Sequence, residues 1–190
     1  MEFKNGLAAI LAAGAVVACL ILSGKQAQNS EQAEAQAYAQ AAMWPALPRQ
    51  QALILLEKYG LPQRISEDRM EWDGQWPWKR VAVSEDQPLS ALTETVSCRV
   101  PQDKLDDLAR YSYGLTADAR LGELSASSGS EALNFLSLNL GMDILTGGRT
   151  PEDASRYFDH AVGLHYAGKS VPYMERLFFD VPLTRRMGLP

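Results

Sequence analysis

The polar residues whose spacing could support chemistry lie in the last third of the chain. Asn139 and Asp143 are four residues apart, which is one turn of a helix. A carboxylate in a buried helix needs a cationic or hydrogen-bonding partner, and Arg120 or Arg149 could supply one. We therefore predict a buried polar network at these two positions. Its role is either a binding site or, as we favour, the fixing of the helix register.

His165 extends this network by one residue in our interpretation. It falls in line with the apolar residues of a second helical segment, which predicts a packed core histidine. If Asp143 or Glu123 met His165 in a cleft, the group could act as a hydrolase on cell-wall or lipid material. This hypothesis requires residues that are distant in sequence to converge.

Aromatic residues form the strongest candidate for binding a partner. The partner-binding candidates are Trp72, Trp76, Trp78 and Arg80. They lie in a predicted β-hairpin, and a three-residue loop over 73–75 would place Trp72 opposite Trp76. Such aromatics could stack on sugars or anchor a partner protein. The alternative, which we favour, is that the aromatic residues cover a helix in a small core.

Several classes of function are excluded by what the sequence lacks. It contains no G-x-G-x-x-G or Walker-type loop, no G-x-S-x-G elbow and no H-E-x-x-H motif. Two cysteines and two histidines leave little material for a metal site. A net charge of −5 gives no basic stripe for nucleic acid. We predict no cofactor, no metal and no nucleic-acid partner, and an enzyme is the less favoured class.

Residues 1–25 are predicted to be an N-terminal membrane anchor, because residues 5–24 carry no charge and could span a bilayer as a helix. Most of the apolar surface comes from Leu7, Ile10, Leu11, Val16, Val17, Leu20, Ile21 and Leu22. We favour an uncleaved signal anchor. The alternatives are a lipoprotein acylated at Cys19 and a cleaved secretory signal. The positive charge of Lys4 weakly favours an amino terminus on the inner side of the inner membrane. The chain after the anchor would then lie on the outer side of that membrane, which is the periplasm if the protein is bacterial.

The remainder divides into a spacer, one domain and a tail. Residues 26–43 are rich in Ala and Gln and predict a solvated helix or flexible spacer with no apolar side to bury. The domain is predicted over 44–180, with a tail over 181–190. Its patterns predict four helices, over 49–59, beginning at 101, over 131–145 and over 150–167. They also predict a hairpin around 73–74 and a strand over 93–100 with Cys98 in the core. A further alternating segment covers 115–126, with a turn or bulge at Gly122.

These elements predict an α+β domain, a small antiparallel sheet packed with four to five helices and preceded by one transmembrane helix. The segment 131–145 is apolar on two sides, so we expect it to be buried on both and to be the central helix. After the membrane anchor is removed, residues 26–190 carry 16 basic and 22 acidic side chains. The soluble part is therefore more acidic than the whole chain.

Four short motifs carry a resemblance to a known family. They are Pro77-Trp78-Lys79-Arg80; Arg99-Val100-Pro101 with Leu105 and Asp106; Gly122-Glu123; and Asn134-Phe135-Leu136 with Asn139. With them the chain resembles, over about residues 53–165, a family of bacterial envelope proteins without an established activity. The resemblance implies an exported or membrane-tethered protein. A weaker likeness in fold, to SmpA/OmlA-type outer-membrane-assembly lipoproteins, rests on Lys58-Tyr59-Gly60-x-Pro62 and the strand with a central Trp that follows.

These observations favour a membrane-tethered binding or assembly module, an accessory subunit of an envelope complex. The predicted contact surfaces are the Trp hairpin and the basic pair Arg185-Arg186. The alternatives are an envelope hydrolase and a glycan-binding protein.

Overall fold

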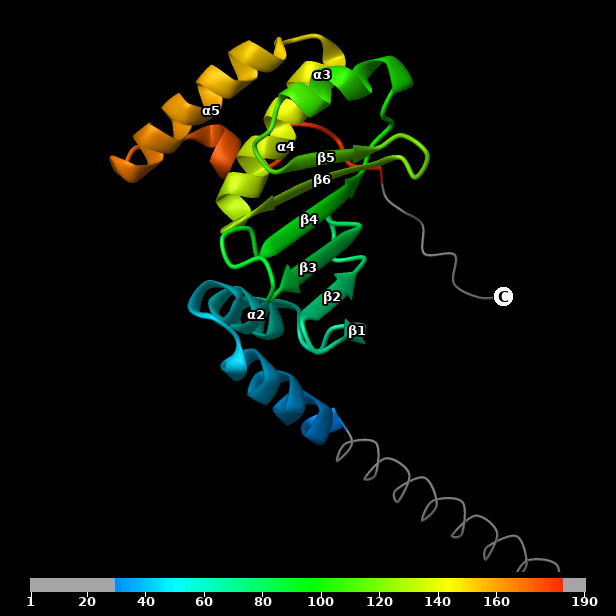
Figure 1. Cartoon of the computed structure of the whole chain (residues 1–190), viewed down its shortest axis with the longest axis vertical. Helices are drawn as coiled ribbons and strands as arrows, with labels where there is room; N and C mark the ends of the chain where they lie inside the picture. Colours follow the sequence, from blue (N-terminus) through cyan, green and yellow to red (C-terminus); the bar gives the residue numbers. More distant parts are fainter. Residues whose placement is uncertain (1–29, 183–190) are drawn as a thin grey trace, which may run out of the picture.

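The computed structural model describes residues 30–182, in which helices pack against an antiparallel sheet (Figure 1). The predicted α+β class and antiparallel sheet are confirmed. The predicted anchor, including Cys19, and the pair Arg185-Arg186 lie outside the described residues. Within 30–182, the helices are all too short or too polar to cross a membrane.

The helices are 30–43, α2 (Ala46–Tyr59), α3 (Leu105–Arg110), α4 (Glu131–Thr146) and α5 (Pro151–Tyr166), with 3₁₀ turns at Gln102–Lys104 and Pro172–Met174. The strands are β1 (Arg64–Ile65), β2 (Arg69–Asp73), β3 (Arg80–Ser84), β4 (Leu92–Ser97), β5 (Leu115–Asp118) and β6 (Glu123–Ser128). Their order across the six-stranded sheet is β1-β2-β3-β4-β6-β5. Each neighbouring pair is antiparallel, and the β5–β6 hairpin joins the sheet through its second strand.

Alternation along the strands gives the sheet one apolar and one polar face. Met70 pairs with Val83, and Val96 with Leu124, and all four side chains are buried. This face meets α2 and α4, because Trp72 on it donates to the end of α2 and α4 packs on β4 and β6. The opposite face carries Thr, Ser and charged side chains, and hydroxyl pairs such as Thr93–Ser127 and Thr95–Ser125 join β4 to β6 there.

The predicted boundaries of the two long helices, α4 and α5, are confirmed to within one or two residues. Ser130 caps α4 by accepting the N–H of Leu133, and Gly147 ends it at φ +77°. Thr150 caps α5 by accepting the N–H of Asp153. Helix α4 packs against β4 and β6 on one side and α5 on the other, as its two apolar sides predicted.

The hairpin between β2 and β3 is confirmed, but its predicted three-residue loop is wrong. Asp73 pairs with Arg80 and Trp72 with Val81, so six residues, 74–79, connect the strands. Pro77 explains the difference, because it has no N–H to donate to the strand ladder that a shorter loop would require.

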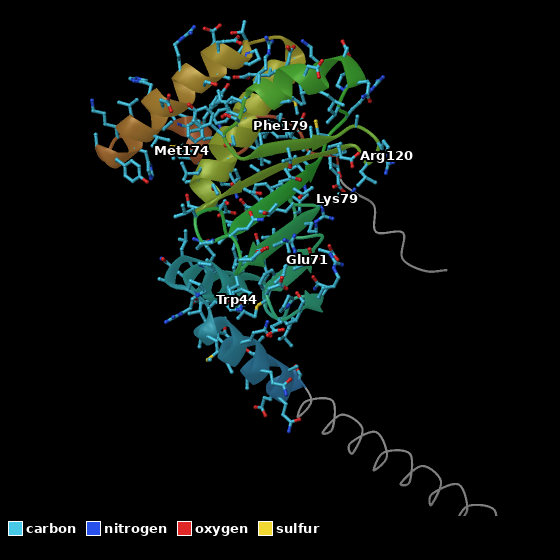
Figure 2. All side chains as sticks on the ribbon, viewed as in Figure 1. Trp44, Glu71, Lys79, Arg120, Met174 and Phe179 are labelled. Atoms are coloured by element: carbon cyan, nitrogen blue, oxygen red, sulfur yellow. The ribbon has the colours of Figure 1, made fainter. Side chains whose placement is uncertain are left out.

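The predicted spacer packs on the domain over its second half, contrary to the expectation that it has no apolar side to bury. Ala37, Ala41 and Trp44 are almost fully buried. Gln40 donates from Nε2 to the carbonyl oxygens of Ser66 and Glu67. Figure 2 shows Trp44 where the helix 30–43 meets the domain. Alanines on one side of this helix are small enough to let it approach closely.

The prediction that Cys98 is a core thiol is confirmed only in part, because its side chain packs against the core without being fully buried. Strand β4 ends at Ser97, so Cys98 falls in the segment that follows and is only partly buried. Its N–H donates to Gly122 O over 2.9 Å, which holds that segment beside the β5–β6 turn. Partial burial raises the pKa of its thiol.

Candidate functional site

Three connecting segments meet at one end of the sheet. They are the β2–β3 loop (74–79), residues 98–100 after β4, and the β5–β6 turn (119–122). Lys79 N donates to Thr95 O at 2.8 Å, and Cys98 N to Gly122 O at 2.9 Å. In the view of Figure 2, the labels of Lys79 and Arg120 both lie at this end of the sheet. The antiparallel strand order brings these three segments to the same end of the sheet.

A buried carboxylate ties the loop to the sheet. Glu123 begins β6, and its side chain is 8% exposed. Its Oε1 lies 2.7 Å from Lys79 Nζ and its Oε2 3.3 Å from Arg80 Nη2. A carboxylate so far removed from water requires such compensation. Because β4 lies between β3 and β6, the Arg80–Glu123 pair reaches over the central strand and fixes the base of the loop.

Two large apolar side chains project from this end of the sheet. Trp76 in the loop is 71% exposed, and Leu121 in the turn is 58% exposed. By contrast Trp78, two residues after Trp76, is 2% exposed and stacks on Phe135 with 5.4 Å between ring centroids. The buried Trp78 and the Glu123 ion pairs therefore anchor a loop whose tip presents an indole to solvent.

Further cations lie in the other two segments at this end of the sheet. Arg99 and Arg120 are exposed and, within residues 30–182, make no ion pair. The nearest acidic group in sequence, Asp118, accepts the backbone N–H groups of Arg120 and Leu121, which hold its pKa below the ordinary value. We call Trp76, Lys79, Arg99, Arg120 and Leu121 the Trp76 surface. It is basic and apolar on a protein whose overall charge is negative.

The four predicted partner-binding residues do not form one cluster. Trp72 is fully buried and donates from Nε1 to Gly60 O at 2.9 Å, so it fixes the end of α2. Trp78 is buried as described, and Arg80 is held by Glu123. Trp76 is the one indole of the three that a partner could reach. Core packing, the favoured interpretation, therefore holds for Trp72 and Trp78 only.

Asn139 is buried, as predicted, and its partners are backbone groups. Its Nδ2 donates to Tyr173 O at 3.0 Å and Arg176 O at 2.8 Å, and its Oδ1 accepts Phe178 N at 2.8 Å. All hydrogen-bonding capacity of the amide except one lone pair is therefore used. The side chain holds the C-terminal segment on α4, which is a structural role.

Asp143 is paired with Arg149, one of the two predicted partners. Arg149 Nε lies 2.8 Å from Asp143 Oδ2, and the guanidinium stacks on Tyr157 at 4.4 Å from the ring centroid. Tyr173 donates to the same carboxylate at 3.3 Å. Burial, and then the carboxylate, raises the pKa of Tyr173. The group links α4, α5 and the C-terminal segment.

The prediction that His165 is a packed core residue is wrong. The buried stripe of α5 stops at Ala161, and His165 is exposed in the last turn beside the 80% exposed Tyr166. Helix α5 begins beside Asp143, and His165 lies about 20 Å further along it at the rise of a helix. With Glu123 held by Lys79 and Arg80, the structure does not bring the three groups of the hydrolase hypothesis together.

One buried pair escaped the sequence analysis. Glu94 is 1% exposed on the helix-covered face of β4, and its Oε2 accepts Asn134 Nδ2 at 3.0 Å. Glu94 Oε1 and Asn134 Oδ1 have no partner among the described residues. Burial raises the pKa of Glu94 to about 8. A signal was present, because Glu94 shares its strand parity with Val96.

The described residues contain no group of three His, Cys, Asp or Glu side chains that could hold a metal ion. Comparison with protein-family models, curated proteins and solved structures finds no match to this chain. The resemblance to envelope proteins and the likeness to SmpA/OmlA-type lipoproteins therefore stay predictions.

Proposed function

We propose that the protein is a membrane-tethered, extracytoplasmic assembly module that binds a partner protein through the Trp76 surface. The observation that carries this proposal is the 71% exposed indole of Trp76 on a loop that is otherwise anchored. Trp and Arg are the residues that most often dominate the binding free energy of protein interfaces. A rigid base limits the entropy lost when such a loop is ordered by a partner.

The charge of the Trp76 surface indicates what kind of partner would bind there. Lys79, Arg99 and Arg120 lie in the same three connecting segments as the two apolar side chains, and of these cations only Lys79 is neutralised by an ion pair in the described chain. A complementary partner would offer an apolar pocket for the indole with carboxylates around it. Basic charge at the contact and acidic charge elsewhere would also orient the protein during encounter.

The membrane tether in this proposal is inferred from the amino-acid sequence. Residues 5–24 carry no charge and are long enough to span a bilayer. The first described helix then runs from residue 30 to the buried Trp44, so little chain separates the apolar segment from the folded domain. Such a short connection would keep the domain close to the membrane, where a partner in the same envelope is found. Acylation at Cys19 would have the same effect.

Site-specific photo-crosslinking tests the proposal on the full chain in its native membrane. A benzophenone amino acid replaces Trp76 in one variant and Tyr166, which is 80% exposed on α5, in a matched control. We expect position 76 to give one discrete protein adduct that Tyr166 does not give. Trp76→Ala in the purified complex should weaken binding about 30-fold or more, the scale of a dominant interface aromatic.

Two results would contradict a protein partner at this site. One is the same adduct pattern from both positions. The other is quenching of Trp fluorescence by cell-wall fragments that is lost in Trp76→Phe, which would favour the glycan-binding alternative. Trp44, Trp72 and Trp78 are buried, so the change at Trp76 can be separated from them.

A further inference from the structure

Helix α2 carries a second, unrelated surface on the side away from the sheet. Its buried side consists of Pro48, Gln51, Ala52, Leu55 and Leu56. The opposite side presents Arg49, Gln50, Leu53, Ile54 and Glu57, which line a shallow hollow together with Tyr38 and Ala46. Ile54 is 44% exposed, and Met43, the last residue of the helix 30–43, is 83% exposed. The centre of this stripe is thus apolar and its two ends are charged.

The charged residues are placed symmetrically. Arg49 lies four residues before Leu53, and Glu57 four residues after it, so the three side chains lie on one face at successive turns. The cation is at one end of the apolar centre and the carboxylate at the other. A two-fold rotation about Leu53 therefore exchanges their places.

We propose that a second copy of this chain docks here, with the two α2 helices antiparallel across a two-fold axis at Leu53. Arg49 of each copy then lies against Glu57 of the other, which gives two equivalent ion pairs. Leu53 and Ile54 form the apolar centre. An interface of this kind must be self-complementary, because the same patch serves both sides. The stripe meets that requirement, whereas docking of a different helix would not require the symmetry.

Both charged groups are available for such pairing. Glu57 is exposed and makes no ion pair within residues 30–182. Arg49 donates from Nε and Nη2 to Trp44 O, at 3.0 and 2.8 Å, so its guanidinium is already ordered. Its Nη1 remains for a carboxylate. Fixing the guanidinium in advance lowers the entropy lost on pairing.

This surface is separate from the Trp76 surface, so the proposal does not depend on the proposed function. The Trp76 surface is formed by loops at the end of the sheet, whereas this one is formed by α2 and the helix 30–43. Loss of the partner adduct at Trp76 and loss of self-association can therefore be measured independently.

Charge reversal in the full chain tests the proposal. Donor- and acceptor-labelled chains are mixed in mild detergent, and energy transfer reports association. We expect wild type to associate, and Glu57→Arg or Arg49→Glu alone to weaken association at least about tenfold by placing like charges together. An equimolar mixture of the two variants should restore association, because each heterodimer contains two opposite-charge pairs.

Matched variants separate the interface from folding and from the apolar N-terminal segment. Asp106→Arg, an equal charge change on the exposed side of α3, should leave association unchanged, and Ile54→Asp should abolish it. Circular dichroism checks that each variant is folded. Monomeric wild type, association that survives Glu57→Arg, or a mixture no better than either variant alone would each overturn the proposal.

Discussion

Glu94 Oε2 accepts a 3.0 Å hydrogen bond from Asn134 Nδ2 beneath helix α4, and the other carboxyl oxygen has no partner in the described chain. The carboxyl group is 1% exposed, on the face of the sheet that otherwise carries apolar side chains. The same Asn134 nitrogen donates to Leu92 O at 3.1 Å. This arrangement suits a protonated carboxyl group better than a carboxylate, because a buried charge without a cation is costly.

Glu94→Gln is expected to remove much of the pH dependence of stability. The pKa of Glu94 is raised from 4.5 to about 8 by burial, so between these values the folded protein keeps a proton that the unfolded chain releases. Stability contributed by this group is complete below pH 4.5 and falls as the pH rises to about 8. Glutamine stays neutral and avoids that loss.

Urea unfolding at pH 5 and pH 9 measures this effect. The Glu94→Gln variant should match wild type at pH 5 and exceed it at pH 9. Asp86→Asn, which changes an exposed carboxylate in the β3–β4 loop, is the control and should differ little from wild type at either pH. Equal changes in Glu94→Gln at both pH values would show that Glu94 is ionised in the folded protein.

Glu123→Gln is expected to lower the free energy of unfolding by about 1–3 kcal/mol, because it leaves two cations without their carboxylate. Lys79 and Arg80 side chains are each about one third exposed, which keeps the loss in the lower part of that range. Arg156→Ala is the matched control. It removes the exposed Arg156–Asp153 pair and should cost no more than about 0.5 kcal/mol. Similar losses in the two variants would contradict the structural role of Glu123.

Asn139→Ala is expected to release the C-terminal segment from α4. Three hydrogen bonds to backbone groups are lost, and their summed net contribution is about 2–4 kcal/mol. Amide hydrogen exchange gives the local measurement. The N–H of Phe178 should exchange faster in the variant, whereas the N–H of Leu133, held by the Ser130 cap, should change much less. Unchanged protection at Phe178 would show that other contacts hold the segment.

Two glycines, both at positive φ, are expected to respond differently to alanine. Gly60, at φ +73° and ψ −152°, has no atom within 4 Å of an added Cβ, so Gly60→Ala should cost only the backbone strain of this glycine-specific conformation, about 1–3 kcal/mol. At Gly114, φ +69°, the added Cβ would overlap the backbone oxygen of Ser127 in the neighbouring strand. Thermal unfolding should show a clearly larger loss for Gly114→Ala, and equal losses would contradict the close approach of the two segments.

Periodic apolar patterns and helix caps were sufficient to predict most elements of this fold. The pattern at 131–145 and the Thr150-Pro151 start predicted α4 and α5, because those signals are local. The hairpin loop was predicted too short, since its length depends on how Pro77 and the long-range bond from Lys79 N to Thr95 O fit the sheet. The composition of residues 26–43 shows no apolar stripe, yet Ala37 and Ala41 of this segment are buried against the domain.

The candidate sites, like the elements of the fold, could be predicted where the signal is local and not where it depends on tertiary packing. Arg149 was one of the two arginines predicted as a partner of Asp143, and it is the one that the short connection between α4 and α5 brings to that carboxylate. Glu123 with Lys79 and Arg80 depends on the order of β3, β4 and β6, which no local pattern encodes. The exposure of Trp76 beside two buried tryptophans also depends on tertiary packing. His165 continued the helical period of α5, but the period does not say where the rest of the core ends.

The contacts of Asn139 also bear on how the cell could distinguish whole chains from truncated ones. Its three backbone partners lie 34 to 39 residues later in the chain. A product of premature termination that stopped before Tyr173 would leave this amide inside α4 with all three partners missing. The central helix would then open more readily to proteases. Proteases would therefore degrade chains that lack the C-terminal segment faster than complete chains.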